Sequence, residues 1–102
     1  MRRKPTSPGK ILFEEFLKPL EITQKEFANH LDSEYKVINR IVNERASVTP
    51  QIAIKLAAAL DTTPDFWLNA QIALDLWKLR SKKPKIRSLV RSKNRAVKIK
   101  TI

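Results

Sequence analysis

Apolar and polar positions follow the period of an amphipathic helix over most of residues 7 to 82. The clearest case is residues 23 to 43, where two short apolar runs are separated by Asp32-Ser33. A step of about 100° per residue divides the second run into two faces. The packing face consists of Val37, Ile38, Ile41 and Val42. The opposite face consists of Tyr35, Lys36, Asn39, Arg40 and Asn43. One side of this helix suits a core, and the other suits hydrogen bonding.

The first apolar run has the features of a short helix with a well-defined start. Thr23, followed three residues later by Glu26, matches a capping box. Phe27, Ala28 and Leu31 then fall on one side of the helix. This pattern predicts a helix that begins directly after Thr23 and packs through those three side chains.

The connection between the two runs is tight. Asp32 suits such a turn because Asp tolerates the left-handed backbone conformation. Either Ser33 or Glu34 precedes the second helix: capping chemistry favours Ser33, and motif spacing favours Glu34. Two amphipathic helices joined this closely predict a helix-turn-helix that binds DNA through the polar face of its second helix.

Three further helices are predicted by one repeated start signal. A capping Ser or Thr stands directly before Pro at Ser7-Pro8, Thr49-Pro50 and Thr63-Pro64. We expect helices from residue 8 to about 18, from 50 to about 60 and from 64 to about 82. Leu20 and Ile22 are expected to fill the core after the first of them. The predicted fold is all-α, a five-helix helix-turn-helix domain over residues 7–82.

The last helix has more apolar surface than one packing face requires. One stripe consists of Phe66, Ala70, Ala73 and Trp77, and a second consists of Leu68, Ile72 and Leu79. Two apolar faces suggest that one lies in the domain core and the other contacts a second subunit. We therefore expect a homodimer that uses Leu68, Ile72 and Leu79. Trp67 and Trp77 are expected to anchor the core or this interface.

Composition removes several classes of function. The 102 residues include one Gly, one His and no Cys. A disulfide framework, a thiol nucleophile, the common zinc clusters and a Gly-rich phosphate loop are therefore excluded. His30 is expected to be a surface or half-buried residue, since it has no partners for a catalytic or metal site. We expect no enzyme activity and no cofactor, and the absence of long apolar runs favours a cytoplasmic protein.

The net charge of +11 is distributed unevenly. Residues 1 to 77 hold ten basic and ten acidic side chains, and residues 78 to 102 add eleven basic ones and no acid. DNA binding by the domain must therefore rest on a few placed donors. Residues 1–6 are expected to be flexible. Residues 83–102 form a basic tail that is expected to be disordered, with a short strand at 97–100 as the alternative.

Two stretches carry a family likeness, SPGKILFEEFLKPLEITQKEFANHL and VTPQIAIKLAAALDTTPDFWLNAQIALDLW. In these stretches the chain resembles the HigA-type antitoxins of bacterial toxin–antitoxin modules, within the phage-repressor-like (XRE) superfamily. The segment TPDFWLNAQIALDLW is the more diagnostic part. The resemblance implies a dimeric repressor of its own operon and a partner toxin, of HigB type, that cleaves mRNA on the ribosome. Ser7, Lys10, Glu21 and Asp32 depart from the family pattern, which commonly has Gly at the last two positions.

Seven residues are the candidates for contacting DNA: Gln24, Tyr35, Lys36, Asn39, Arg40, Asn43 and Arg45. Tyr35, Lys36, Asn39 and Arg40 are expected at base edges in the major groove. The superfamily resemblance gives Gln24 a phosphate-binding role at a helix N-terminus. Asn43 and Arg45 are expected to hold the DNA backbone. Val37 is expected in the core, with contact to a thymine methyl as the alternative.

Two questions stay open at this stage. The tail has three possible roles: a solvated segment, a phosphate clamp on DNA, or a segment that orders on the toxin; a basic toxin disfavours the last. Glu14 and Glu15 are weak candidates for toxin contact. A free-standing regulator without a toxin is the alternative function, and a small nuclease is disfavoured because no ligand cluster is present.

Overall fold

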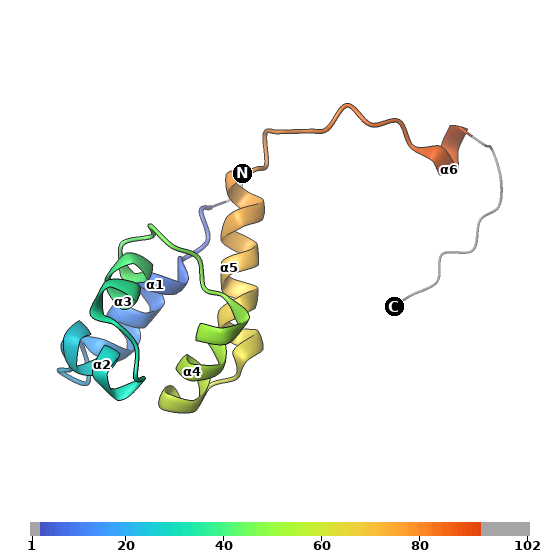
Figure 1. The fold of residues 1–102 in the computed structure, drawn as a ribbon. Helices are drawn as coiled ribbons and strands as arrows, with labels where there is room; N and C mark the ends of the chain where they lie inside the picture. The colour runs from blue at the N-terminus through green and yellow to red at the C-terminus, as the bar shows by residue number, and fades with distance from the viewer. Residues whose placement is uncertain (1–2, 93–102) are drawn as a thin grey trace.

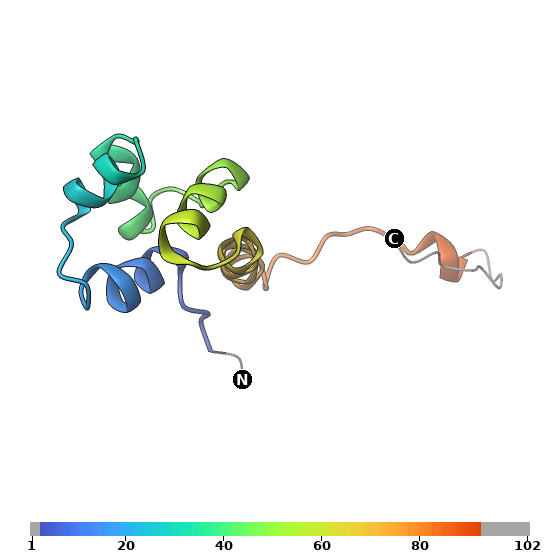
Figure 2. The same cartoon turned by 90° about the horizontal axis from the view of Figure 1, so that it is seen from below.

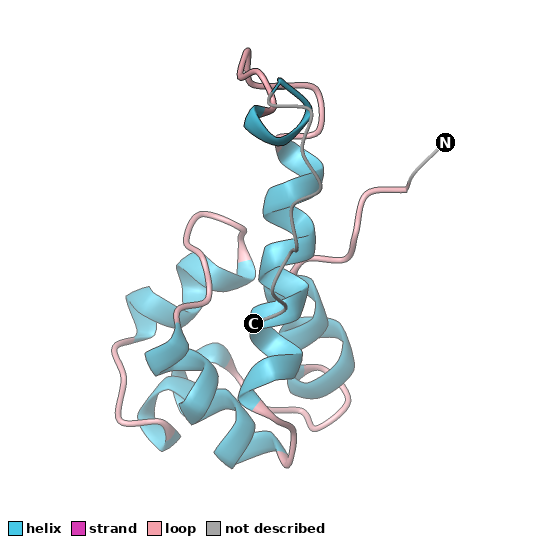
Figure 3. Ribbon diagram, turned by 90° about the vertical axis from the view of Figure 1, so that its right-hand side faces the viewer, coloured by secondary structure: helices cyan, strands magenta, loops and turns pink. Residues whose placement is uncertain are grey.

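The computed structural model describes residues 3–92, and over that range it contains helices and loops but no strand (Figure 3). The elements are α1 (Pro8–Ile11), the π-helix η1 (Leu12–Leu17), α2 (Gln24–His30), α3 (Tyr35–Val42), α4 (Pro50–Leu60), α5 (Pro64–Lys78) and α6 (Leu89–Ser92). Because η1 continues α1 directly, the domain has the five helices that the sequence predicts, and the all-α prediction is confirmed. The candidate strand at 97–100 lies outside the described residues.

The three Ser/Thr-Pro signals each start a helix as expected. The side chains of Ser7, Thr49 and Thr63 accept hydrogen bonds from the backbone N–H groups of Lys10, Ile52 and Phe66, at 3.1, 3.3 and 3.2 Å. These bonds satisfy N–H groups that have no partner within the helix.

The capping box at the start of α2 is also present. The Thr23 hydroxyl accepts from the Glu26 N–H at 3.0 Å, and the Glu26 carboxylate accepts from the Thr23 N–H at 3.0 Å. The bond from the Thr23 backbone, followed by that from its side chain, lowers the pKa of Glu26 below its ordinary value. The first helix of the motif is therefore fixed at its N-terminus, as its sequence predicts.

The predicted end of the last helix was wrong by about one turn. Instead of continuing to residue 82, α5 ends at Lys78. Arg80 folds back, donating to the Trp77 carbonyl at 2.7 Å and placing its guanidinium 3.7 Å from the Trp77 ring centre. A side chain that satisfies a terminal carbonyl favours an end to the helix at that point.

The core is centred on Trp67, which is fully buried. Its ring lies 5.8 Å from that of Phe16 and 5.1 Å from that of Phe66, and its Nε1 donates to the Thr62 hydroxyl at 2.7 Å. Phe27, Ala28 and Leu31 are buried as predicted. Leu20 was predicted to fill the core but is 56% exposed, because the turn after η1 carries it outward while Ile22 packs on the core.

The buried face of α5 differs from both predicted stripes. It consists of Trp67, Gln71 and Leu74. Gln71 accepts from the Val48 N–H at 2.9 Å and donates to Asp75 at 2.9 Å. A buried amide satisfied in this way is tolerated in a core, so a polar residue lies at the centre of the packing face. The chain just before α4 is thereby attached to α5.

The helices are arranged so that α3 is held from behind and exposed in front. In Figures 1 and 2, α4 lies alongside α5, and α1 lies behind α3. Gly9 allows α1 to approach the C-terminal end of α3: a Cβ at this position would overlap the Ile41 carbonyl oxygen and lie 2.8 Å from the Cα of Val42. The sequence has no other glycine.

Four residues with a Cβ adopt the left-handed conformation where a helix or turn ends. Glu21, Asp32, Glu44 and Asp61 have φ angles of 55°, 55°, 58° and 53°. Each position favours Gly or Asn. The turn around Asp32 therefore keeps the expected geometry without glycine, and the prediction made for Asp32 is confirmed.

Candidate nucleic-acid interface

The outward face of α3 presents a continuous polar surface. Tyr35, Lys36, Arg40 and Asn43 are exposed, and Asn39 is half-buried beside them. Glu34 is the N-cap of α3, and its side chain makes no capping bond. The Ser33 hydroxyl instead accepts from the Lys55 amino group on α4 at 3.2 Å. Glu34 as the N-cap decides the question left open by the sequence in favour of motif spacing.

Asn39 links the two helices of the motif. Its Nδ2 donates to the Gln24 Oε1 at 3.0 Å and to the Tyr35 hydroxyl at 3.2 Å. Both amide protons of Asn39 are therefore engaged, and its Oδ1 remains as an acceptor. Gln24 likewise keeps its amide nitrogen as a donor at the N-terminus of α2. The sequence places these residues on suitable faces but does not reveal that they bond to one another.

The loop after α3 carries the remaining candidates. The Asn43 side chain donates to the Asn39 carbonyl at 2.9 Å, which caps the end of α3. Arg45 is exposed, and its backbone N–H donates to the Arg40 carbonyl at 2.7 Å. Between them, Glu44 pairs with Lys4 at 3.4 Å. The loop is thus held close to α3 with the Arg45 guanidinium outside.

Val37 was predicted to lie in the core, and that prediction is wrong. Its side chain is 41% exposed, whereas Ile38 and Ile41 on the same helix are buried. Val37 lines a groove with Lys36 and Arg40, and with Ala46, Ser47 and Thr49 from the following loop. The core closes over Ile38 and Ile41, so Val37, at the edge of the apolar arc, remains at the rim of the polar surface.

The second apolar face of α5 is exposed. Ile72, Leu76 and Leu79 are 54%, 65% and 53% exposed. Leu68, predicted to lie on the same face, is half-buried against the core. Leu76 was not predicted for this face, although it follows Ile72 by four residues and so shares its side of the helix.

Residues 3–92 were also compared with the requirements of a metal site and of a membrane-spanning helix. That part of the chain holds no group of three His, Cys, Asp or Glu side chains arranged for a metal ion. His30 is exposed, as predicted. Within the same range, no helix is both long and apolar enough to cross a membrane.

Comparison with known proteins identifies the family. The sequence model described as "HTH_3: Helix-turn-helix" matches residues 13–67, which include the whole motif and the buried Trp67. The chain belongs to the helix-turn-helix family. One relative in this family, an uncharacterized HTH-type transcriptional regulator of Haemophilus influenzae, is 48% identical over 83 residues, which cover 81% of this chain and 78% of that protein.

Other members of the helix-turn-helix family are antitoxins. Antitoxin HigA-1 of Vibrio cholerae is 43% identical over 81 residues, covering 79% of this chain and 76% of that protein. The structure of antitoxin GraA in complex with its operator is 40% identical, with a TM-score of 0.72 and coverage of 80% of this chain and 81% of that chain. The resemblance to HigA antitoxins is therefore confirmed. This is a family of DNA-binding regulators and antitoxins, not of enzymes.

Proposed function

We propose that the protein is an antitoxin and repressor that binds operator DNA as a homodimer, represses its own operon and neutralises a HigB-type toxin that cleaves mRNA. The observation that carries this proposal is the polar face of α3, organised through Asn39 by Gln24 and Tyr35. The GraA structure, with its operator bound, supports the same use of the fold.

In the proposed complex, α3 enters the major groove. Lys36 and Arg40 donate to guanine O6 and N7, contacts worth about 1–3 kcal/mol each. Asn39 has only Oδ1 free, so it accepts from the exocyclic amino group of adenine or cytosine. Tyr35 lies at the base edges on the other side of Asn39. The contacts of Asn39 thus leave it an acceptor role, whereas Lys36 and Arg40 are donors by their own chemistry.

The DNA backbone is held from both ends of the motif. Gln24 offers its amide nitrogen and the N-terminus of α2 to one phosphate. Asn43 and Arg45 hold the backbone at the other end of α3. These contacts position α3, while sequence discrimination comes from the residues on its polar face.

A homodimer is proposed through the exposed face of α5, formed by Ile72, Leu76 and Leu79, with Leu68 at its edge. An apolar row of this kind on one helix suits pairing with its own copy about a two-fold axis. Such a dimer would bind a pseudo-palindromic operator with half-sites about one DNA turn apart.

The toxin-neutralising part of the proposal is tested by co-expression. The reading frame beside this gene, induced alone, should stop growth of the host if it encodes the toxin. Co-induction of this protein should restore growth, and the two proteins should co-purify. Glu14 and Glu15, both exposed, are the acidic positions proposed for contact with a basic toxin.

A free-standing transcriptional regulator is the second candidate function. The H. influenzae relative carries a regulator's name, which favours this alternative. If the neighbouring frame is harmless and does not co-purify, but the protein still binds DNA upstream of its own gene, this alternative is correct and the toxin part is wrong.

A further inference from the structure

The positive charge of this protein is concentrated in a segment that the family model does not include. Residues 78–92, which we call the basic arm, carry seven Lys and Arg and no Asp or Glu. The family model ends at residue 67. The preceding residues, 1 to 77, contain equal numbers of acidic and basic groups. A domain without net charge attracts DNA weakly over distance, so the arm is the main source of long-range attraction.

The cations of the basic arm are available for a partner. Every residue from Lys78 through Arg91 is exposed. Within residues 3–92 the two ion pairs, Lys4–Glu44 and Lys18–Glu14, lie outside the arm. Arg80 is engaged with Trp77 and fixes the start of the arm. The other six side chains of the arm remain as donors: Lys78, Lys82, Lys83, Lys85, Arg87 and Arg91.

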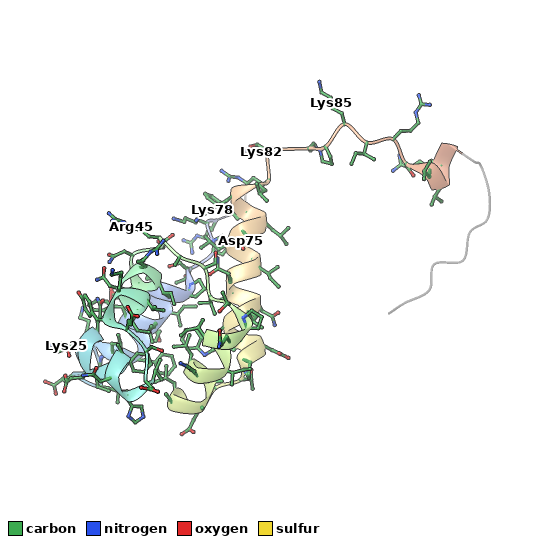
Figure 4. All side chains as sticks on the ribbon, in the orientation of Figure 1. Lys25, Arg45, Asp75, Lys78, Lys82 and Lys85 are labelled. Atoms are coloured by element: carbon green, nitrogen blue, oxygen red, sulfur yellow. The ribbon has the colours of Figure 1, made fainter. Side chains whose placement is uncertain are left out.

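The arm begins at the end of the domain that carries Arg45, one of the proposed backbone contacts. Lys78 and Arg45 line the same hollow of about 170 Å³, together with Glu44 and Ser47. Figure 4 shows Arg45, Lys78 and Lys82 at this one end of the molecule. A DNA strand held by Arg45 would therefore pass close to the root of the arm.

The arm is long enough to follow the DNA outward. Between Leu79 and α6 the described chain has no regular helix or strand beyond the turn that ends α5. Ten residues can span up to about 33–36 Å when extended. One turn of DNA is about 34–36 Å long. The arm can therefore reach phosphates up to one turn beyond the half-site contacted by α3.

We propose that the basic arm is a second, sequence-independent DNA-binding element that neutralises phosphates in the duplex flanking each operator half-site. This inference rests on the proposed operator binding. It assigns affinity and association rate to the arm, and sequence discrimination to α3. Ile86 lies between Lys85 and Arg87, and the pair Leu89-Val90 lies between Arg87-Ser88 and Arg91, so cations recur along the arm and the arm as a whole matches a polyanion.

The test uses the full chain and fluorescence anisotropy between 50 and 200 mM salt. The neutralised variant carries Lys82→Gln, Lys83→Gln and Lys85→Gln, and the control carries Lys→Arg at the same positions. Each lost phosphate contact reduces the slope of log affinity against log salt by about 0.9, so three remove about 2.7 per protomer. Over this fourfold salt range, the neutralised variant should lose about 40-fold less affinity than the wild type for each arm on the DNA, or on the order of 10³-fold less for a dimer with both arms engaged. The Arg control should match the wild type.

Two DNA probes locate the contact. Adding ten base pairs to each side of the operator should tighten binding of the wild type and the Arg control, and should tighten that of the Gln variant much less. Scrambled DNA should lose as much affinity as operator DNA on neutralisation. An unchanged salt slope, or no effect of the flanks, would overturn the proposal. A Gln variant that loses affinity for single-stranded RNA but keeps its affinity for duplex DNA would also overturn the proposal, because the arm would then bind RNA.

The same measurements distinguish a failure of the proposed function from a failure of the arm proposal. If the wild type binds operator and scrambled duplexes equally, operator recognition is absent whatever the arm does. If it prefers the operator but shows no dependence on arm charge, only the arm proposal is wrong.

Discussion

Val37 is an apolar side chain at the rim of an otherwise polar surface. It lies beside Lys36 and Arg40, and its 41% exposure leaves its methyl groups in contact with solvent. In the major groove, the thymine methyl is the apolar feature of the base edges. The exposed position makes contact with DNA the better interpretation of Val37, in place of the core role expected from the helical pattern.

The Val37 contact can be tested by removing one methyl group from the DNA. Each operator thymine is replaced in turn by deoxyuridine, and affinity is measured for the wild type and Val37→Ala. One replacement should weaken the wild type by about 0.8 kcal/mol, roughly fourfold. The same replacement should leave Val37→Ala unchanged. Equal losses for both proteins at every thymine would exclude the contact.

Single residues also mark the limit of what the pattern predicts. Tyr35, Lys36 and Arg40 are exposed on the face assigned from sequence, because a period of 3.6 residues fixes which side chains share a face. Val37 was misplaced, and the burial of Gln71 was not predicted, because the burial of both side chains depends on neighbouring elements. Gln71 is buried because the Val48 N–H and Asp75 satisfy it. Periodicity contains no information about such partners.

At the scale of elements, the position of α3 depends on Gly9. Any side chain there would collide with the backbone of Ile41 and Val42. The sequence shows one glycine, but not that two helix backbones meet at it. Helix starts were predicted well because caps are local; the end of α5 was missed because it depends on how Arg80 folds onto Trp77.

Gly9→Ala should destabilise the domain strongly. Overpacking against a backbone costs about 3 kcal/mol, at the upper end of the usual range. For a domain of this size, thermal unfolding should show a Tm lower by roughly 12–24 °C. Lys10→Ala, at the adjacent exposed position, should change Tm little. A Gly9→Ala protein as stable as the wild type would show that α1 and α3 do not approach this closely.

The left-handed residue Glu21 should respond in the opposite direction. The left-handed conformation costs a residue with a Cβ about 1–2 kcal/mol, and part of this is offset by the entropy that Gly loses on folding. Glu21→Gly should therefore raise the free energy of unfolding by about 0.5–1 kcal/mol. Glu21→Ala keeps the Cβ and should give no such gain. Urea denaturation distinguishes the two, and equal stabilities would show that Glu21 is not strained.

At the scale of the whole molecule, the apolar face of α5 is predicted to make the dimer. Ile72→Glu or Leu76→Glu should yield folded monomers in light scattering, because the two copies of the new carboxylate would be buried close together at the two-fold axis. Ile54→Glu on α4 is the matched control, since Ile54 is 60% exposed and lies off this face. A dimer that survives both α5 substitutions would exclude this interface.

The division of labour between α3 and the basic arm gives the molecule two separable properties. The arm should set how affinity depends on salt and on flanking DNA, while α3 should set which sequence is bound. Composition alone would assign both to the net charge of +11. The placement of the charge instead leaves residues 1–77, which carry the proposed sequence-reading face of α3, with equal numbers of acidic and basic groups.

The most direct test of operator recognition through α3 is the specificity ratio of Arg40→Ala. Affinities of the wild type and Arg40→Ala are measured for the operator and for a scrambled duplex of equal length at one salt concentration. The account predicts that the substitution weakens operator binding by about 1–3 kcal/mol, roughly 5- to 150-fold, and changes scrambled binding much less. Equal losses on the two duplexes would contradict it, because Arg40 would then contact only the DNA backbone.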